Sequence, residues 1–167
     1  MAFDLDNCRN EKLPIEDDSV SEFYMSHCIE HIKDTLALMQ DLHRVAIPGA
    51  KITIRTPYGS SDDAWEDPTH VRAYFLQSWL YFAQPAYWRA DYGYRGDWQA
   101  ELVVLSVDKY DPRIAEFQPE DILRKVYVER NLVKEMTAVL RAIKPIREAK
   151  KELQRPPRVH FSFGGST

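Results

Sequence analysis

One stretch near the start of the chain constrains the fold most, because in order it predicts a strand, a helix and a second strand. Residues 23–25 are a short apolar run, and residues 51–55 are rich in β-branched side chains, which favour strands. Between them Asp34 is a typical helix N-cap, and Pro48 with Gly49 indicates the helix end. A strand, helix and strand in this order predict two neighbouring parallel strands. The apolar stripe of the helix consists of Leu36, Met39, Leu42 and Val45.

Polar side chains follow both strands of this unit. Residues 26–31 come directly after the first strand, and residues 56–67 come after the second. In open parallel sheets, ligands bind beyond the carboxyl ends of the strands, so we expect a site here. Imidazole and carboxylate groups suit proton transfer near neutral pH. The candidates of this kind are His27, Glu30, His31, Asp67 and His70.

Several motifs occur in an order that one known family shares. They are Leu13-Pro14-Ile15, then Ile29-Glu30-His31, then Arg-Val-Ala-Ile-Pro-Gly-Ala at residues 44–50. This series resembles the second half of a class I S-adenosylmethionine-dependent methyltransferase of the small type 11 kind, and residues 64–79 resemble one bacterial branch of it. The resemblance implies an α/β fold. It would be a partial Rossmann-like sheet, mostly parallel with a C-terminal antiparallel strand pair, and with helices on both faces.

The resemblance also implies S-adenosylmethionine as the cofactor. Residues 2–6 would form the family's third strand, and the loop at residues 7–19 would lie against the adenine. One departure is important, because the family's Gly-rich turn brings the backbone close to the cofactor, and here no glycine precedes Gly49. The chain is therefore either a fragment of a longer reading frame or a half-domain, and we expect weak or no cofactor binding. The implied cofactor contacts are Asp4, Asp6, Leu13, Ser26, His27 and Glu30.

For catalysis, we expect His70 or His31 to act as the base for the methyl acceptor, with Asp67 beside them. Two structural alternatives remain open. Glu30 with His31 can cap the following helix and orient a loop, and Asp67 can form an Asx-type turn. A metal site made of His27, His31, Glu30 and Asp67 is disfavoured, because the His-Glu-x-x-His order is missing and His27 falls at a strand end.

The whole chain, residues 1–167, is expected to form a single truncated domain with three parts. Residues 1–57 hold the core strand-helix-strand unit. Residues 58–98 are rich in Tyr, Trp and Arg, which suit an acceptor pocket for planar or sugar-like molecules. The alternative for this part is a small satellite core under a long loop. Residues 99–167 are expected to close the sheet.

Further elements are predicted within these parts. The aromatic face of residues 71–82 indicates a helix. Residues 99–107 and residues 158–163 are expected strands, and the resemblance implies that they pair antiparallel. A long helix is expected at residues 119–144, because Pro119 suits a first helical position. Its apolar stripe would consist of Ile122, Val126, Val133, Met136, Leu140 and Ile143.

Composition excludes several classes of protein. The net charge of −4 argues against a nucleic-acid-binding surface, and no apolar run approaches the roughly 20 residues that span a membrane. Early acids and the lack of a cationic start argue against a signal peptide. The two cysteines, Cys8 and Cys28, form no disulfide framework and favour the cytoplasm. Cys28 also lacks the Gly-x-Cys-x-Gly elbow of a nucleophile.

An unpaired strand predicts self-association. In the family's sheet order, the strand at residues 22–26 has lost its usual neighbour, which leaves an open edge for another chain. The apolar stripe of the helix at residues 119–144 is a second candidate surface. We therefore expect a homo-oligomer, most simply a two-fold dimer. Two functions remain open: a methyltransferase for a small-molecule acceptor, and a non-catalytic module that acts through self-assembly or partner binding.

Overall fold

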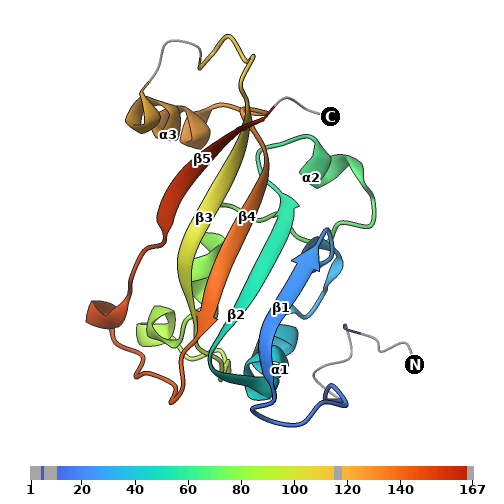
Figure 1. The fold of residues 1–167 in the computed structure, drawn as a ribbon, viewed down its shortest axis with the longest axis vertical. Coiled ribbons are helices and arrows are strands. Elements are labelled where there is room, and N and C mark those ends of the chain that lie inside the picture. Colours follow the sequence, from blue (N-terminus) through green and yellow to red (C-terminus); the bar gives the residue numbers. More distant parts are fainter. Residues whose placement is uncertain (1–4, 6–10, 115–117, 165–167) are drawn as a thin grey trace.

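A five-stranded mixed sheet forms the centre of the molecule, in the order β1-β2-β4-β3-β5 (Figure 1). This computed structural model describes Leu5, residues 11–114 and residues 118–164. With the helices that pack on the sheet, it confirms the expected α/β class. The strands are β1 (Val20–Ser26), β2 (Ala46–Pro57), β3 (Trp98–Asp108), β4 (Val133–Ala142) and β5 (Arg158–Gly164).

All strands except β4 run in the same direction. β1 pairs parallel with β2, and β3 pairs parallel with β5, whereas β4 is antiparallel to both β2 and β3. Most strands therefore run in one direction, as expected, and the antiparallel ladders are the two that β4 forms with β2 and with β3. The expected antiparallel pairing of residues 99–107 with residues 158–163 is wrong. β4 takes the antiparallel position, and β5 adds in parallel to the other side of β3.

Helix α1 (Thr35–Val45) begins as the sequence predicts, because the Asp34 carboxylate accepts a hydrogen bond from the Ala37 N–H at 3.1 Å. The helix ends earlier than expected. Ala46 already pairs with Val20 of β1, so its backbone is extended, and Pro48 with Gly49 belongs to β2. The parallel pairing of β1 and β2 confirms the predicted strand-helix-strand unit.

Two expected helices are wrong. Residues 71–82 form no regular helix, because the Tyr74 backbone pairs with Tyr58 and its carbonyl accepts from the Gly59 N–H at 2.7 Å. The expected helix at residues 119–144 is the shorter α3 (Pro119–Val128) followed by β4. None of the described helices is both long and apolar enough to span a membrane. The remaining helical elements are α2 (Asp63–Glu66) and the 3-10 turns Ile29–His31, Ser78–Phe82, Gln84–Trp88 and Lys151–Leu153.

The hydrophobic core lies on one face of the sheet. There Ile54 and Leu140 are fully buried, together with Leu38 of α1 and Trp79 of the aromatic region. Alternate side chains of the strands point to the other face and are exposed or half-buried. Figure 1 looks onto this second face, with α1 behind the sheet. α2 and α3 lie near the upper end of the sheet in Figure 1, so α1 is the labelled α-helix that packs on a face, where helices on both faces were expected. The second face carries Lys51, Thr53, Arg55, Thr137, Val139 and Arg141.

Candidate functional site

The carboxyl ends of β1 and β2 open onto one polar cavity of about 420 Å³. β1 ends at Ser26, and the next residue, His27, has a φ of 49°. This left-handed conformation is uncommon outside glycine and is often found at functional sites. The cavity lies where the sequence predicts a site. Its lining residues are His27, His31, Pro57, Asp63, Glu66, Asp67, His70, Lys134 and Glu135.

Glu30 is the buried carboxylate of this site, with 2% of its surface exposed. Its Oε2 accepts a hydrogen bond from the Thr56 hydroxyl of β2 at 3.1 Å. Its Oε1 is buried and accepts no hydrogen bond from the described residues, and the His27 Nδ1 lies 3.5 Å away. The Glu30 carbonyl accepts from the N–H groups of Val71 and Arg72, at 2.9 and 3.3 Å. Glu30 thus attaches the loop after β2 to the turn after β1.

His31 and His70 meet in this site, with ring centroids 4.7 Å apart and planes at 68°. The Thr69 hydroxyl donates to Asp67 at 2.6 Å, so its oxygen accepts from the His31 Nδ1–H at 3.0 Å. The His70 Nδ1 lies 3.2 Å from the Ala64 carbonyl, which can only accept, so this nitrogen also carries the proton. The Nε2 atom of each neutral ring therefore keeps its lone pair.

Asp67 forms the expected Asx-type turn, with its carboxylate accepting from the Thr69 N–H at 2.8 Å. The hydrogen bonds from the Thr69 hydroxyl and N–H hold the pKa of Asp67 below its usual value. The His70 Nε2 lies 3.8 Å from this carboxylate. No side chain of the turn Ile29–His31 caps a helix, because Asp34 caps α1. The sequence also suggested that Glu30 and His31 orient a loop. The Glu30 carbonyl does so, because it accepts hydrogen bonds from the loop after β2.

Glu135 of β4 is a site residue that the sequence analysis missed. One oxygen lies 3.0 Å from the His27 Nε2, and the other accepts from the Arg55 Nε at 2.5 Å. The hydrogen bond from Arg55 to Glu135 raises the pKa of Arg55. Glu135 escaped notice because its segment was expected to be helical. The available signal was the polar pair Lys134-Glu135 between the apolar Val133 and Met136.

The other implied cofactor residues do not join this site. Leu13 is buried near the far end of α1, where its N–H donates to the Asp41 carboxylate at 2.6 Å. Ser26 is exposed at the end of β1. Asp4 and Asp6, with the strand expected at residues 2–6, lie outside the described residues except for Leu5, which packs against the core.

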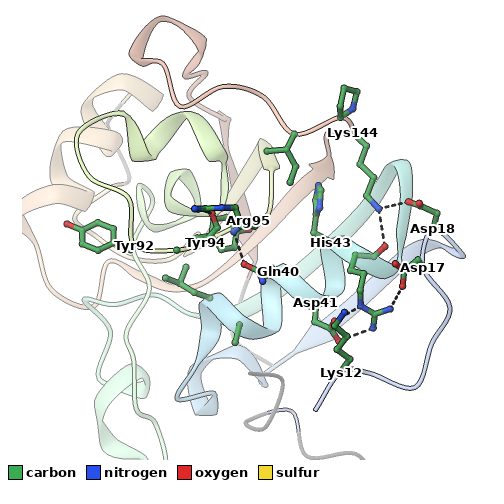
Figure 2. A pocket seen from close by; sticks show the side chains of 16 residues that line it. Lys12, Asp17, Asp18, Gln40, Asp41, His43, Tyr92, Tyr94, Arg95 and Lys144 are labelled. Carbon is green, nitrogen blue, oxygen red and sulfur yellow. Dashed lines mark hydrogen bonds and ion pairs between the residues drawn. The ribbon is translucent and has the colours of Figure 1, made fainter. Parts of the chain in front are cut away.

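A larger cavity of about 640 Å³ lies beside the C-terminal half of α1 (Figure 2). Apart from Lys12, the charged side chains that line it take part in structural contacts. Arg44 pairs with Asp41 at 2.6 Å and with Asp17, and Lys144 pairs with Asp18. The hydrogen bond to Asp41 is the main cause that raises the pKa of Arg44. These ion pairs attach the loop before β1 to the rest of the protein. Because the paired groups satisfy one another, they are poorly available to bind a ligand or to transfer a proton.

The aromatic region divides between core and pocket. Tyr74 stacks on Trp79 with centroids 5.3 Å apart, and burial raises the pKa of Tyr74 to about 12. Tyr81 and Tyr92 are exposed, and both line a cavity of about 280 Å³ that also includes Arg72. The buried aromatic side chains of residues 58–98 join the main hydrophobic core and form no separate satellite core, and the acceptor pocket stays a prediction. The residue types fit a planar ligand, but nothing in the geometry selects one.

Cys28 has no feature of a nucleophile in this site. Burial, and then the negative charge of Glu30, raise the pKa of its thiol. A nucleophilic cysteine instead needs a lowered pKa, because the thiolate is the reactive form. The thiol is free.

The strand order β1-β2-β4-β3, with only β4 reversed, is the sheet of the class I S-adenosylmethionine-dependent methyltransferases, and the chain has this fold. One similar structure is a complex from Haloferax volcanii between the methyltransferase activator Trm112 and a protein described as a methyltransferase. A chain of this complex matches 89% of the present chain at 17% identity and a TM-score of 0.50. A SAM-dependent methyltransferase from Archaeoglobus fulgidus matches 84% at 12% identity and a TM-score of 0.51.

These likenesses concern the fold, because their sequence identities are low. The chain spans 62% of the Haloferax chain and 66% of the Archaeoglobus chain, less than two thirds of each. No protein-family profile matches the sequence. No protein of curated function matches it either.

Proposed function

We propose that this chain forms the acceptor side of an S-adenosylmethionine-dependent methyltransferase. The observation that carries the proposal is the His31–His70 pair beside the buried Glu30, in a cavity beyond the carboxyl ends of β1 and β2. In sheets of this kind, ligands bind at that edge. The acceptor would be a small molecule, and the aromatic cavity with Arg72 suits one with a planar group.

The chemistry of this chain's residues would be proton removal. An acceptor hydroxyl or amine has to lose its proton, and a well-placed base contributes about 10²–10⁴-fold to the rate. The free Nε2 lone pair of His70 or His31 would receive that proton. Asp67, 3.8 Å from the His70 Nε2, would stabilise the resulting positive charge.

We propose that the described residues do not hold the nucleotide part of the cofactor site. No glycine precedes Gly49 in the sequence, so the turn that brings backbone N–H groups close to the cofactor is not among these residues. Among the described residues, β1 has a neighbouring strand only on the β2 side. We therefore propose that the nucleotide part lies outside these 167 residues.

Calorimetric titration of the 167-residue chain with S-adenosylmethionine and with S-adenosylhomocysteine tests the cofactor part. We expect weak binding or none to either compound. A dissociation constant in the low micromolar range would contradict the proposal that these residues hold only the acceptor side.

A second function is supported by the edge of β1, with which no described strand other than β2 pairs. Phe23, Tyr24 and Met25 bring no proline or inward charge that would block pairing with another chain. We propose a two-fold dimer as the simplest outcome, in a cytoplasmic protein. The second expected route, the stripe of a helix at residues 119–144, is withdrawn because β4 uses those side chains in the core. The Haloferax chain was solved in a complex with an activator, which fits a partner-binding module.

A further inference from the structure

We propose that Glu30, His31 and His70 form a binding site for a divalent transition-metal ion of the zinc class. One ligand atom from each of the three residues lies within 4.8 Å of the others. Two imidazoles and one carboxylate are the donor set of several catalytic zinc sites. This goes beyond the proposed function, because metal binding does not depend on methyl transfer.

The two imidazoles are already oriented as metal ligands usually are. A metal-bound histidine almost always donates its other ring N–H to a carbonyl, carboxylate or water, which fixes the tautomer. Here the Nδ1 of His31 faces Thr69 at 3.0 Å, and the Nδ1 of His70 faces the Ala64 carbonyl at 3.2 Å. Each Nε2 lone pair is left available for an ion.

Glu30 provides an independent indication of a ligand. Its side chain is 2% exposed, and its Oε1 accepts no hydrogen bond from the described residues. A buried carboxylate oxygen without a partner costs free energy unless a charge or a donor satisfies it. The His27 Nδ1, 3.5 Å away on a side chain that is 47% exposed, is a weak substitute. A bound cation would satisfy this oxygen directly.

The geometry leaves the ion accessible from one side. Ligand atoms about 2.1 Å from a tetrahedral ion lie roughly 3.4 Å apart, so the three side chains have to approach by about an ångström. His31 and His70 both line the 420 Å³ cavity, so a fourth position faces open space for water or an acceptor. Acidic groups outnumber lysine in the cavity wall, with Asp63, Glu66, Asp67 and Glu135 against Lys134.

The ion would change the chemistry of the site. A coordinated hydroxyl group loses its proton more readily because the positive charge lowers its pKa. The imidazoles would then act as ligands, since coordination uses the lone pairs that a base needs. Only this use of the ion rests on the proposed function.

Zinc binding to the 167-residue chain tests the site without any activity assay. After dialysis against a chelator, titration with Zn²⁺ alone should show one ion per chain and a dissociation constant in the micromolar range or tighter. Glu30→Gln, His31→Ala and His70→Ala should each weaken binding at least about 10-fold. His160→Ala, on the exposed strand β5, is the matched control and should leave the affinity unchanged. Absence of Zn²⁺ binding, or equal affinity in all four variants, would overturn the proposal.

Imidazole ¹⁵N chemical shifts of the unaltered protein provide a second measurement if a variant fails to fold. We expect Zn²⁺ to shift the Nε2 resonances of His31 and His70 and to leave His43 and His160 unchanged. Shifts confined to other histidines would overturn the proposal.

Discussion

The imidazole of His31 packs edge to face on that of His70, with ring centroids 4.7 Å apart, although the two residues follow different strands. The contact depends on the Glu30 carbonyl, which binds the N–H groups of Val71 and Arg72 directly after His70. A main-chain contact therefore sets the distance between two reactive side chains. Substitutions that leave this backbone intact can test each side chain alone.

His70 should be more important for turnover than for cofactor binding. In a protein that joins this chain to a nucleotide-binding half, His70→Ala should lower methyl transfer by about 10²–10⁴-fold, because the acceptor loses its base. The dissociation constant for S-adenosylmethionine should change little. Steady-state kinetics with calorimetry would measure both effects, and His160→Ala is the control. Unchanged turnover would assign His70 a structural role.

Asp97 should be a major determinant of stability. It is fully buried, it accepts from the Nε and Nη2 of Arg147 at 2.8 and 2.7 Å, and it accepts from the Gln84 N–H at 3.2 Å. Asp97→Ala removes the charged partner of the Arg147 guanidinium and the acceptor of two N–H groups, those of Gln84 and Arg147, so the free energy of unfolding should fall by about 3–5 kcal/mol.

Urea denaturation would measure the Asp97 effect. Asp91→Ala is the matched control, because Asp91 also pairs with an arginine, Arg95, but at an exposed site. We expect little change in that variant. Equal losses in the two variants would contradict the importance of burial.

His43 should make stability depend on pH. Burial is the main cause that lowers its pKa, and Lys144 acts in the same direction, whereas the Ile143 carbonyl, Asp97 and Asp18 oppose it. The unfolded chain therefore binds a proton on His43 at a higher pH than the folded chain does. The contribution is complete above about pH 6.5 and is lost as the pH falls toward the folded-state pKa.

His43→Gln tests this dependence. The amide can still donate to the Ile143 carbonyl, which the His43 Nε2 contacts at 3.1 Å, but it does not titrate. The decrease in unfolding free energy between about pH 7 and pH 5 should be smaller in this variant than in the unaltered protein. His160→Gln should keep the original slope, and an unchanged slope in His43→Gln would contradict the prediction.

The open edge of β1 should make the chain a dimer at micromolar concentration. Sedimentation should give twice the 19.5 kDa mass of one chain. Tyr24→Lys places a charge on the edge, and because Tyr24 is 67% exposed it should dissociate the dimer without unfolding the monomer. Tyr110→Lys, at another exposed tyrosine, should remain dimeric. A clean monomer of the unaltered chain would mean that the edge is covered internally.

Local signals explain which elements were predicted correctly. The Asp34 cap and the stripe of α1 are encoded in neighbouring residues, so the strand-helix-strand unit could be predicted. β4 was mistaken for helix because Met136 and Leu140 fit a helical spacing as well as an alternating one. The small Ala138 and Ala142, which complete the alternation, carried too little signal.

The site was predictable in composition but not in contacts. Glu30 and His31 stand together in the sequence, whereas His70 reaches them only through the loop after β2. Nothing near His70 in sequence specifies that approach, which is a tertiary contact. Glu135 could not be assigned while its strand was taken as helix. The implied cofactor role of Leu13 rested on family likeness and stays a prediction; in the structure the Leu13 N–H donates to the Asp41 carboxylate.

The position of β4 has a consequence for the order of folding. β2 and β3 share no ladder, because β4 lies between them and pairs with both. A nascent chain that has emerged only as far as Leu132 therefore holds β1 with β2 on one side and an unpartnered β3 on the other. The sheet becomes continuous only when β4 enters between strands made earlier. Synthesis on the ribosome must therefore reach β4 before the core can close. Until then the unpaired edges of β2 and β3 stay exposed and are prone to aggregation.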